Sequence, residues 1–311
     1  MAYQLQEINR RIRDDAPGFL AECDANFHAN VCRAADHIIG NLKHSPIVLL
    51  SGPSGSGKTT TAKKIEEELE RRGVLSHTVS MDNYFRNVDL VNGPKTPEGG
   101  YDYESPLCLD MDLLEEHFTA LSQGEDIRIP YFSFSRKMRA TSRCTPMTLG
   151  KSESAIVEGI HALNDDLTGR HPEATKLYIS ARSDVLEDGS LRFKGTWMRL
   201  ARRSVRDYNF RGSSVVETLA MWANVRRGEK LYISPFKNRA DIMFDTSLPY
   251  EVSVMRHYAV PLFQAIPEDN PRRQEMLDLV AAFDHVLPID PSLVSPSSLL
   301  REFIGGGTYQ Y

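Results

Sequence analysis

The stretch that decides the fold is "PIVLLSGPSGSGKTT", residues 46–60. It contains the pattern G-x-x-x-x-G-K-[ST], filled by Gly52, Gly57, Lys58 and Thr59. Glycines let successive backbone N–H groups turn toward one anion, and a helix that follows aims its positive end at the same point. Lys58 is then placed to reach the β- and γ-phosphates of a nucleoside triphosphate, and the Thr59 hydroxyl to bind Mg²⁺.

The residues on both sides of this loop support that interpretation. Residues 47–50 are an apolar run typical of a strand buried on both faces. After the loop, Ala62, Ile65 and Leu69 recur at spacings of three and four until Gly73, which predicts a helix. A glycine-rich turn with an accidental lysine would not require this context. The predicted nucleotide-binding residues are Gly52, Ser54, Gly55, Ser56, Gly57, Lys58, Thr59 and Thr60.

Short apolar runs alternate with longer amphipathic ones along the rest of the chain. The runs after the loop are 77–80, 155–159, 176–180, 241–244 and, less clearly, 285–288. This alternation predicts an α/β fold with a mainly parallel sheet and helices on both faces. Residues 1–44 contain no strand-like run, and we expect two helices there, separated near Pro17. Residues 86–106 have the composition of a long loop.

We therefore divide the chain into a helical N-terminal segment (1–44), a main domain (45–290) and a C-terminal tail packing on that domain (291–311). The net charge of −5 gives no overall basic field for nucleic acid or an anionic membrane. The four scattered cysteines suggest neither a zinc site nor a disulfide framework. With no apolar signal core or membrane-length stretch, we expect a cytoplasmic protein. Assembly into a homo-oligomer stays open.

Two carboxylates follow predicted strands. Asp82, in "SMDNYF", emerges near the carboxyl edge of the sheet, where it can accept the proton of an attacking hydroxyl. The alternative for Asp82 is a cap of a turn or helix. Glu158 ends the run "AIVE", where such folds place an acidic group over Mg²⁺, and its alternative is a solvated strand end.

Arginines recur at helical spacings in residues 192–212, with apolar residues on the complementary face. They are Arg199, Arg202, Arg203 and Arg206, with Arg211 just beyond the predicted helix. This pattern predicts one helix face that clamps phosphates, as part of a lid over residues 192–230. A solvated charged face is the alternative.

The order of six motifs resembles the uridine kinase and phosphoribulokinase family, in particular its bacterial uridine-kinase-like branch. The motifs are "GPSGSGKTT", "SMDNYF", "YDYESP", "IRIPYFSFSRKMR", "IVEGIHAL" and "RRSVRDYNFRG", spread over residues 46–248. The resemblance implies a P-loop kinase that uses ATP and Mg²⁺ to phosphorylate a small-molecule acceptor. It implies transfer to the 5′-hydroxyl of a nucleoside, with uridine or cytidine as the expected acceptor.

The resemblance also implies roles for individual residues. Asp82 falls on the family's catalytic base, with Lys58 and Arg206 completing the catalytic set, and Thr59 and Glu158 fall on the metal site. Glu104 falls where the family holds ribose hydroxyls. The remaining implied residues line the nucleoside pocket (Phe85, Phe132, Phe134, Lys137) or form the basic lid (Arg203, Arg206, Arg211). Of the lid residues, Arg203 is assigned to the nucleotide, and Arg206 and Arg211 to the acceptor.

Three departures from the family pattern bear on the acceptor. Lys137 stands where pyrimidine-specific members carry a histidine, Phe132 replaces a tyrosine, and Ser213 follows Gly212 in place of a second arginine. Lys137 and the arginines would suit an anionic acceptor, so a kinase for a sugar phosphate or another small alcohol is one alternative. A nucleotide-binding regulatory protein without turnover is another, although Asp82 and Glu158 favour an enzyme.

Overall fold

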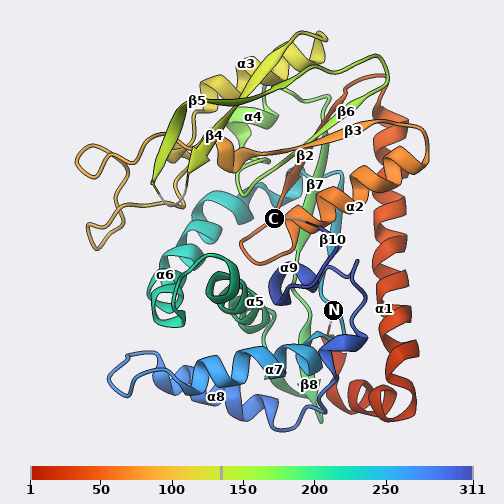
Figure 1. Ribbon diagram of the computed structural model, residues 1–311, viewed down its shortest axis with the longest axis vertical. Coiled ribbons are helices and arrows are strands. Elements are labelled where there is room, and N and C mark those ends of the chain that lie inside the picture. Colours follow the sequence, from red (N-terminus) through yellow and green to blue (C-terminus); the bar gives the residue numbers. More distant parts are fainter. Residues whose placement is uncertain (1, 134–135, 310–311) are drawn as a thin grey trace.

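A five-stranded sheet forms the centre of the computed structural model, which describes residues 2–133 and 136–309 (Figure 1). Its strand order is β10-β7-β2-β6-β3, and every neighbouring pair runs parallel. The strands are β2 (Ile47–Ser51), β3 (Ser76–Ser80), β6 (Ser154–Glu158), β7 (Thr175–Ser180) and β10 (Ile242–Asp245). They coincide, within a residue at each end, with the first five apolar runs.

The central strand β2 is buried along its whole length. Ile47 and Leu49 belong to the hydrophobic core on one face of the sheet, and Val48 and Leu50 to the core on the other. A strand whose side chains alternate between two apolar layers has to be apolar at every position, because neither face meets water. The predicted α/β fold with helices on both faces is therefore confirmed.

Two helical layers cover the sheet. One contains α1 (Leu5–Asn41), α2 (Lys58–Arg71), α5 (Gly195–Phe210), α6 (Val215–Gly228), α7 (Glu251–Gln264) and α8 (Arg273–Phe283). The other contains α3 (Met111–Ser122) and α4 (Asp165–Thr168). Shorter helical turns are η1 (Met81–Tyr84), η2 (Pro106–Cys108), η3 (Glu229–Ile233), η4 (Ser234–Arg239), η5 (Pro291–Leu293) and α9 (Arg301–Ile304). Among the described residues, no helix combines the length and the apolar character needed to cross a membrane.

Two smaller sheets flank the central one. A hairpin joins β4 (Ile127–Ser133) to β5 (Met138–Met147), and a three-stranded sheet has the order β1-β8-β9, with β8 at Asp184–Glu187 and β9 at Ser190–Phe193. Strand β1 (Ala2–Gln4) contradicts the expectation that residues 1–44 hold no strand. Its three residues pair with β8, from a distant part of the chain, and are too short to show a periodic pattern.

The long helix α1 contains the break expected near Pro17. Asp15 has φ −162° and ψ 85°, and its side chain accepts a hydrogen bond from the backbone N–H of Gly18 at 3.0 Å. Asp15 thus caps the second half of α1, and Pro17 lies in its first turn, where a missing N–H costs nothing. The prediction of a strand at 285–288 is wrong, because these residues form a turn and irregular backbone. The carbonyl of Val286 bonds to Arg256 of α7 instead of a strand.

The strand order indicates that ligands bind at the carboxyl ends of the parallel strands. The carboxyl ends of β2, β3 and β6 lie together at one edge of the sheet. From β2 the chain first builds β3 and β6 on one side of that strand and then crosses to β7 and β10 on the other side. Open α/β sheets bind ligands at such a reversal of strand order. The loop between β2 and α2 lies at this point.

Candidate active site

The loop after β2, together with the first turn of α2, is here called the phosphate loop (residues 52–60). The shape of this loop requires its glycines. Gly55 and Gly57 have φ of +75° and +81°, in the left-handed region. A Cβ on Gly52 would lie 2.1 Å from the carbonyl oxygen of Ile179 in β7. Side chains at these positions would strain or displace the loop, so the glycine pattern follows from backbone geometry.

The phosphate loop presents donors suited to an anion. The Ser56 hydroxyl is buried and has no hydrogen-bond partner among the described residues. The Lys58 ammonium makes a long contact of 3.4 Å to the Pro53 carbonyl, and burial lowers the pKa of Lys58, with Glu158 and Asp82 opposing that shift. A cation and a hydroxyl held at a helix N-terminus fit a phosphate group.

Thr59 and Glu158 lie together beside this loop. The Thr59 hydroxyl is 3.5 Å from Glu158 Oε1. Burial raises the pKa of Glu158, while the nearby Lys58 lowers it and Asp82 raises it by repulsion. A hydroxyl and a buried carboxylate form an oxygen donor set of the kind that Mg²⁺ prefers, and a cation there would stabilise the ionised carboxylate.

Asp82 lies in η1, directly after β3. The cap of this short helix is Ser80, whose hydroxyl accepts a hydrogen bond from the backbone N–H of Asp82 at 3.4 Å. The capping role considered for Asp82 thus belongs to Ser80. Asp82 raises the pKa of Lys58 by attraction and that of Glu158 by repulsion, so it lies near enough to act on both charged groups.

Two of the α5 arginines do not face a phosphate site, which corrects the expectation of one phosphate-clamping face. Arg202 is fully buried and pairs with Glu251 of α7, at 2.5 Å, and Arg199 pairs with Glu229 at 2.7 Å. Their remaining N–H groups bond to backbone carbonyls of the phosphate loop, Arg199 to Ser54 at 3.0 Å and Arg202 to Gly55 at 3.3 Å. Both arginines therefore hold the loop from outside.

The other three arginines gather around Asp207, a buried residue that the sequence interpretation missed. Arg206 donates to its carboxylate at 2.7 and 2.9 Å, and Arg203 and Arg211 lie 3.2 and 3.7 Å from it. Arg203 also donates to the Ser54 hydroxyl at 2.8 Å. The signal in the sequence is a single acid in "RRSVRDYNFR", residues 202–211, with arginines one residue before it and four residues on either side.

Glu104 approaches the same site from the long loop. Burial raises its pKa to about 7, with Arg203 and Lys58 opposing the shift. The neighbouring Asp102 is buried and ties the loop to α6 through Asn224, at 3.1 Å, and Arg227. A Cβ on Gly228 of α6 would lie 2.3 Å from that of Glu104, so the absence of a side chain there makes room for this carboxylate.

The aromatic residues expected around the acceptor are brought together in part. The rings of Phe85 and Phe132 lie 5.4 Å apart at 41°, whereas Phe134 falls outside the described residues. Lys137 is exposed, and its ammonium lies 5.9 Å from the centre of the Tyr103 ring.

His161 is a second residue that the sequence interpretation did not single out. It lies two residues beyond the Gly159 that follows β6 and is 2% exposed. The backbone of Glu104 and of Tyr232 lies beside its ring nitrogens, although neither contact has the geometry of a good hydrogen bond. Burial lowers its pKa to about 4.

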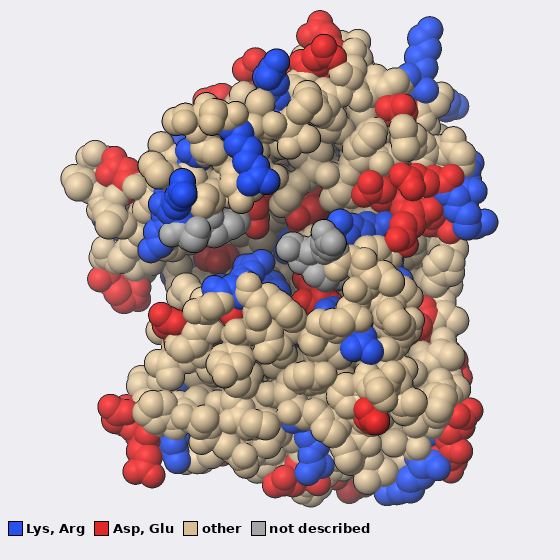
Figure 2. Space-filling model, in the orientation of Figure 1, with Lys and Arg blue, Asp and Glu red and all other residues tan. Residues whose placement is uncertain are grey.

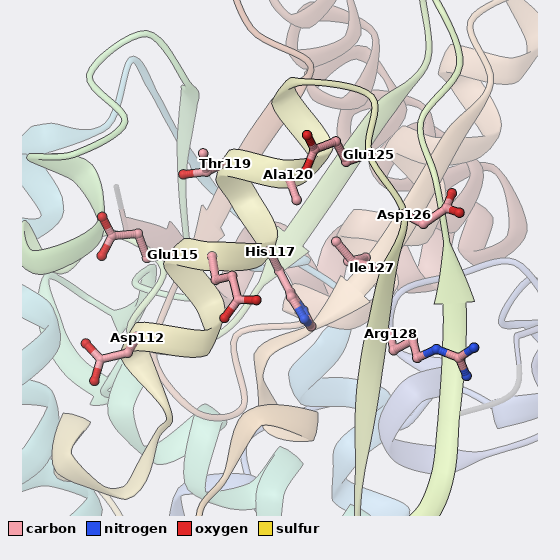
Figure 3. Close-up of a pocket in the computed structure, with 10 residues that line it drawn as sticks. Asp112, Glu115, His117, Thr119, Ala120, Glu125, Asp126, Ile127 and Arg128 are labelled. Atoms are coloured by element: carbon pink, nitrogen blue, oxygen red, sulfur yellow. The ribbon is translucent and has the colours of Figure 1, made fainter.

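The surface view shows a hollow across the middle of one face, with acidic and basic side chains on its rims (Figure 2). A separate hollow lies between α3 and the first residues of β4 (Figure 3). Half of the ten residues that line it are acidic, and none of them is a predicted site residue. There His117 bonds to the Tyr84 hydroxyl at 2.8 Å, which gives it a structural role.

Comparison with known proteins identifies a family. Residues 47–252 match the sequence profile described as "Phosphoribulokinase / Uridine kinase family". A uridine kinase of Brevibacillus brevis is 29% identical over 201 residues, 64% of this chain and 84% of the relative. A uridine kinase of Halobacterium salinarum is 27% identical over 195 residues, 62% of this chain and 77% of the relative.

A solved structure described as a putative fructose transport system kinase from Silicibacter sp. TM1040 has a similar fold. Its TM-score is 0.52 at 19% identity, with 69% of this chain and 98% of that chain covered. This likeness concerns the fold alone. The profile match covers about two thirds of the sequence, and the chain therefore belongs to the phosphoribulokinase/uridine kinase family.

Proposed function

We propose that this member of the family is an ATP-dependent kinase that transfers the γ-phosphoryl group to the 5′-hydroxyl of a nucleoside, with uridine or cytidine as the expected acceptor. The observation that carries the proposal is the convergence at one sheet edge of the phosphate loop, the Thr59 and Glu158 oxygen pair, and the carboxylate of Asp82. Kinases and GTPases use such parts to position phosphates, metal and an attacking hydroxyl.

Each residue has one role in this proposal. The backbone N–H groups of residues 54–60 and the Lys58 ammonium hold the phosphates of ATP. Thr59 and Glu158 would hold Mg²⁺, which would supply charge neutralisation at the phosphate oxygens. Asp82 takes the proton of the acceptor hydroxyl. Arg203 and Arg206, oriented by Asp207, stabilise negative charge that develops during transfer.

The acceptor would lie between the long loop and α6. In this proposal the Glu104 carboxyl accepts hydrogen bonds from two neighbouring hydroxyls, and the base packs on the Phe85 and Phe132 rings, which lie 5.4 Å apart. Because Lys137 is exposed, we expect only a weak preference among bases from that residue.

An anionic acceptor such as a sugar phosphate is the second candidate. The observation in its favour is that three arginines share the single carboxylate of Asp207, which leaves positive charge on the lid. Arginine forks are well suited to a phosphate group on the acceptor.

Acceptor-dependent ADP release from purified protein tests both candidates. We expect turnover with uridine and cytidine above that with a purine nucleoside or ribulose 5-phosphate, and ratios that change less than about twofold in Lys137→His, below the size of a normal pocket contact. Faster turnover of the sugar phosphate would select the second candidate. ADP binding without turnover of any acceptor would indicate a regulatory nucleotide-binding protein.

A further inference from the structure

The C-terminal residues 291–309 lie against the phosphate loop, beside α5 and the start of α2 (Figure 1). Arg301 holds this segment in one shape, because its guanidinium donates to the backbone carbonyls of Pro291, Val294, Ser295 and Gly305. A Cβ on Gly57 would lie 2.7 Å from the Leu299 side chain. The segment is thus an ordered part of the surroundings of the loop.

Glu302 in α9 contacts the phosphate loop directly. Its Oε2 accepts a hydrogen bond from the Thr60 hydroxyl at 2.5 Å and another from the Thr60 backbone N–H at 3.3 Å. The carboxylate is largely buried, and its charge acts on Lys58 and Glu158, raising the pKa of each. Glu302 lies outside residues 47–252, so the family match does not account for it.

The donors that Glu302 occupies are those that the loop offers to a nucleotide. Thr60 is the third residue of α2, so its N–H is among the first four of the helix, which point toward the N-terminal end of the helix. In a phosphate loop, such groups surround the α- and β-phosphates. A carboxylate at this place is an anion on the positive end of α2 and repels further negative charge.

We propose that Glu302 competes with nucleotide phosphate for Thr60, so that the C-terminal segment restrains the nucleotide site. Nucleotide binding then displaces the carboxylate, and the measured affinity is lower than the loop alone would give. This inference rests on the proposed function only in requiring that the loop binds a nucleotide. The alternative is that Glu302 is a structural cap of α2.

Isothermal titration of ADP with Mg²⁺ into wild type, Glu302→Gln and Glu70→Gln separates these roles. Glutamine keeps the size of the side chain and an oxygen for Thr60 but removes the charge. We expect Glu302→Gln to bind ADP at least tenfold more tightly, a difference of about 1.4 kcal/mol. Glu70 is exposed near the end of α2 that is remote from the phosphate loop, so it serves as the charge-matched control. Glu70→Gln should leave the ADP affinity unchanged.

ADP affinity of Glu302→Gln that is weaker than that of wild type, or within about twofold of it, would overturn the proposal. Such a result is expected if Glu302 is only a structural cap of α2, because weakening a cap does not strengthen ADP binding. Should Glu302→Gln not fold, Glu302→Asp decides. It keeps the charge but withdraws the carboxylate by one methylene, and at least threefold tighter binding is expected.

The same experiment distinguishes this proposal from the proposed function. Binding of ADP by no variant would remove the nucleotide site and both proposals with it. Tighter binding by Glu302→Gln without phosphorylation of any acceptor would leave the competition in place and overturn only the kinase assignment. Equal ADP binding by all three proteins, together with turnover of an acceptor, would overturn the competition and leave the kinase assignment in place.

Discussion

Asp82 illustrates how single residues divide into positioning and chemistry at this site. Its backbone N–H is held by Ser80, and its charge acts on both Lys58 and Glu158. We expect Asp82→Asn to lower kcat by about a hundredfold or more, the usual effect of removing a positioned general base. ADP affinity, measured by titration, should stay near that of wild type. A collapse of affinity with turnover preserved would make Asp82 a metal or structural residue instead.

Glu104 gives the site a dependence on pH. Burial raises its pKa to about 7, from an ordinary value of 4.5. Between these values the unfolded chain loses a proton that the folded protein keeps, so the stability of the folded protein falls as pH rises through this window. The variant Glu104→Gln lacks this loss.

The melting temperatures of wild type and Glu104→Gln, without nucleotide, test that sign. The melting temperature of Glu104→Gln minus that of wild type should increase from pH 5 to pH 8 and change little above pH 8. A difference between the two proteins that is the same at both pH values would show that the Glu104 carboxyl titrates normally.

At the scale of elements, the contact between α5 and α7 fixes the phosphate loop. The Arg202 and Glu251 pair is buried, and Arg202 also bonds to the carbonyls of Gly55 and Thr246. Removing one partner of a buried ion pair leaves the other charge without compensation, which costs about 3–5 kcal/mol. We expect Arg202→Met to lose free energy of unfolding in this range, measured by urea denaturation.

Arg239→Met is the matched control for that measurement. Arg239 also pairs with a carboxylate, that of Asp165 at 2.9 Å, but the two side chains are 56% and 51% exposed. Exposed ion pairs contribute about 0–1 kcal/mol. A loss in Arg202→Met no greater than in the control would mean that the buried pair adds little to stability.

The elements also show where sequence patterns suffice. The buried strands and the phosphate loop were predictable, because the apolar run of β2 and the required glycines reflect local geometry. The arginine spacing in α5 predicted that the guanidinium groups share one side of the helix, but not which carboxylates they would pair with. Glu229 and Glu251, which take up Arg199 and Arg202, belong to later parts of the chain. The short strand β1 and the contact of Glu302 with Thr60 likewise depend on distant partners.

At the scale of the whole molecule, ligand binding and stability are linked. A ligand that binds only the folded protein adds RT ln(1 + [L]/Kd) to its stability, about 2.7 kcal/mol at a hundred times Kd. We expect ATP with Mg²⁺ to raise the melting temperature of wild type by several degrees and to leave that of Lys58→Ala nearly unchanged. An equal rise in both proteins would show that the nucleotide binds without Lys58.

The wide separation in sequence of contacting residues bears on how the chain acquires its structure during synthesis. Val48 of the central strand pairs with Ile156 and Thr175, so β2 has no neighbour in its sheet until much later residues have left the ribosome. Thr60 and Glu302 are 242 residues apart. At typical elongation rates this interval lasts on the order of tens of seconds. A nascent chain would therefore complete its phosphate loop before the carboxylate arrives, and nucleotide present in the cell would meet the loop first.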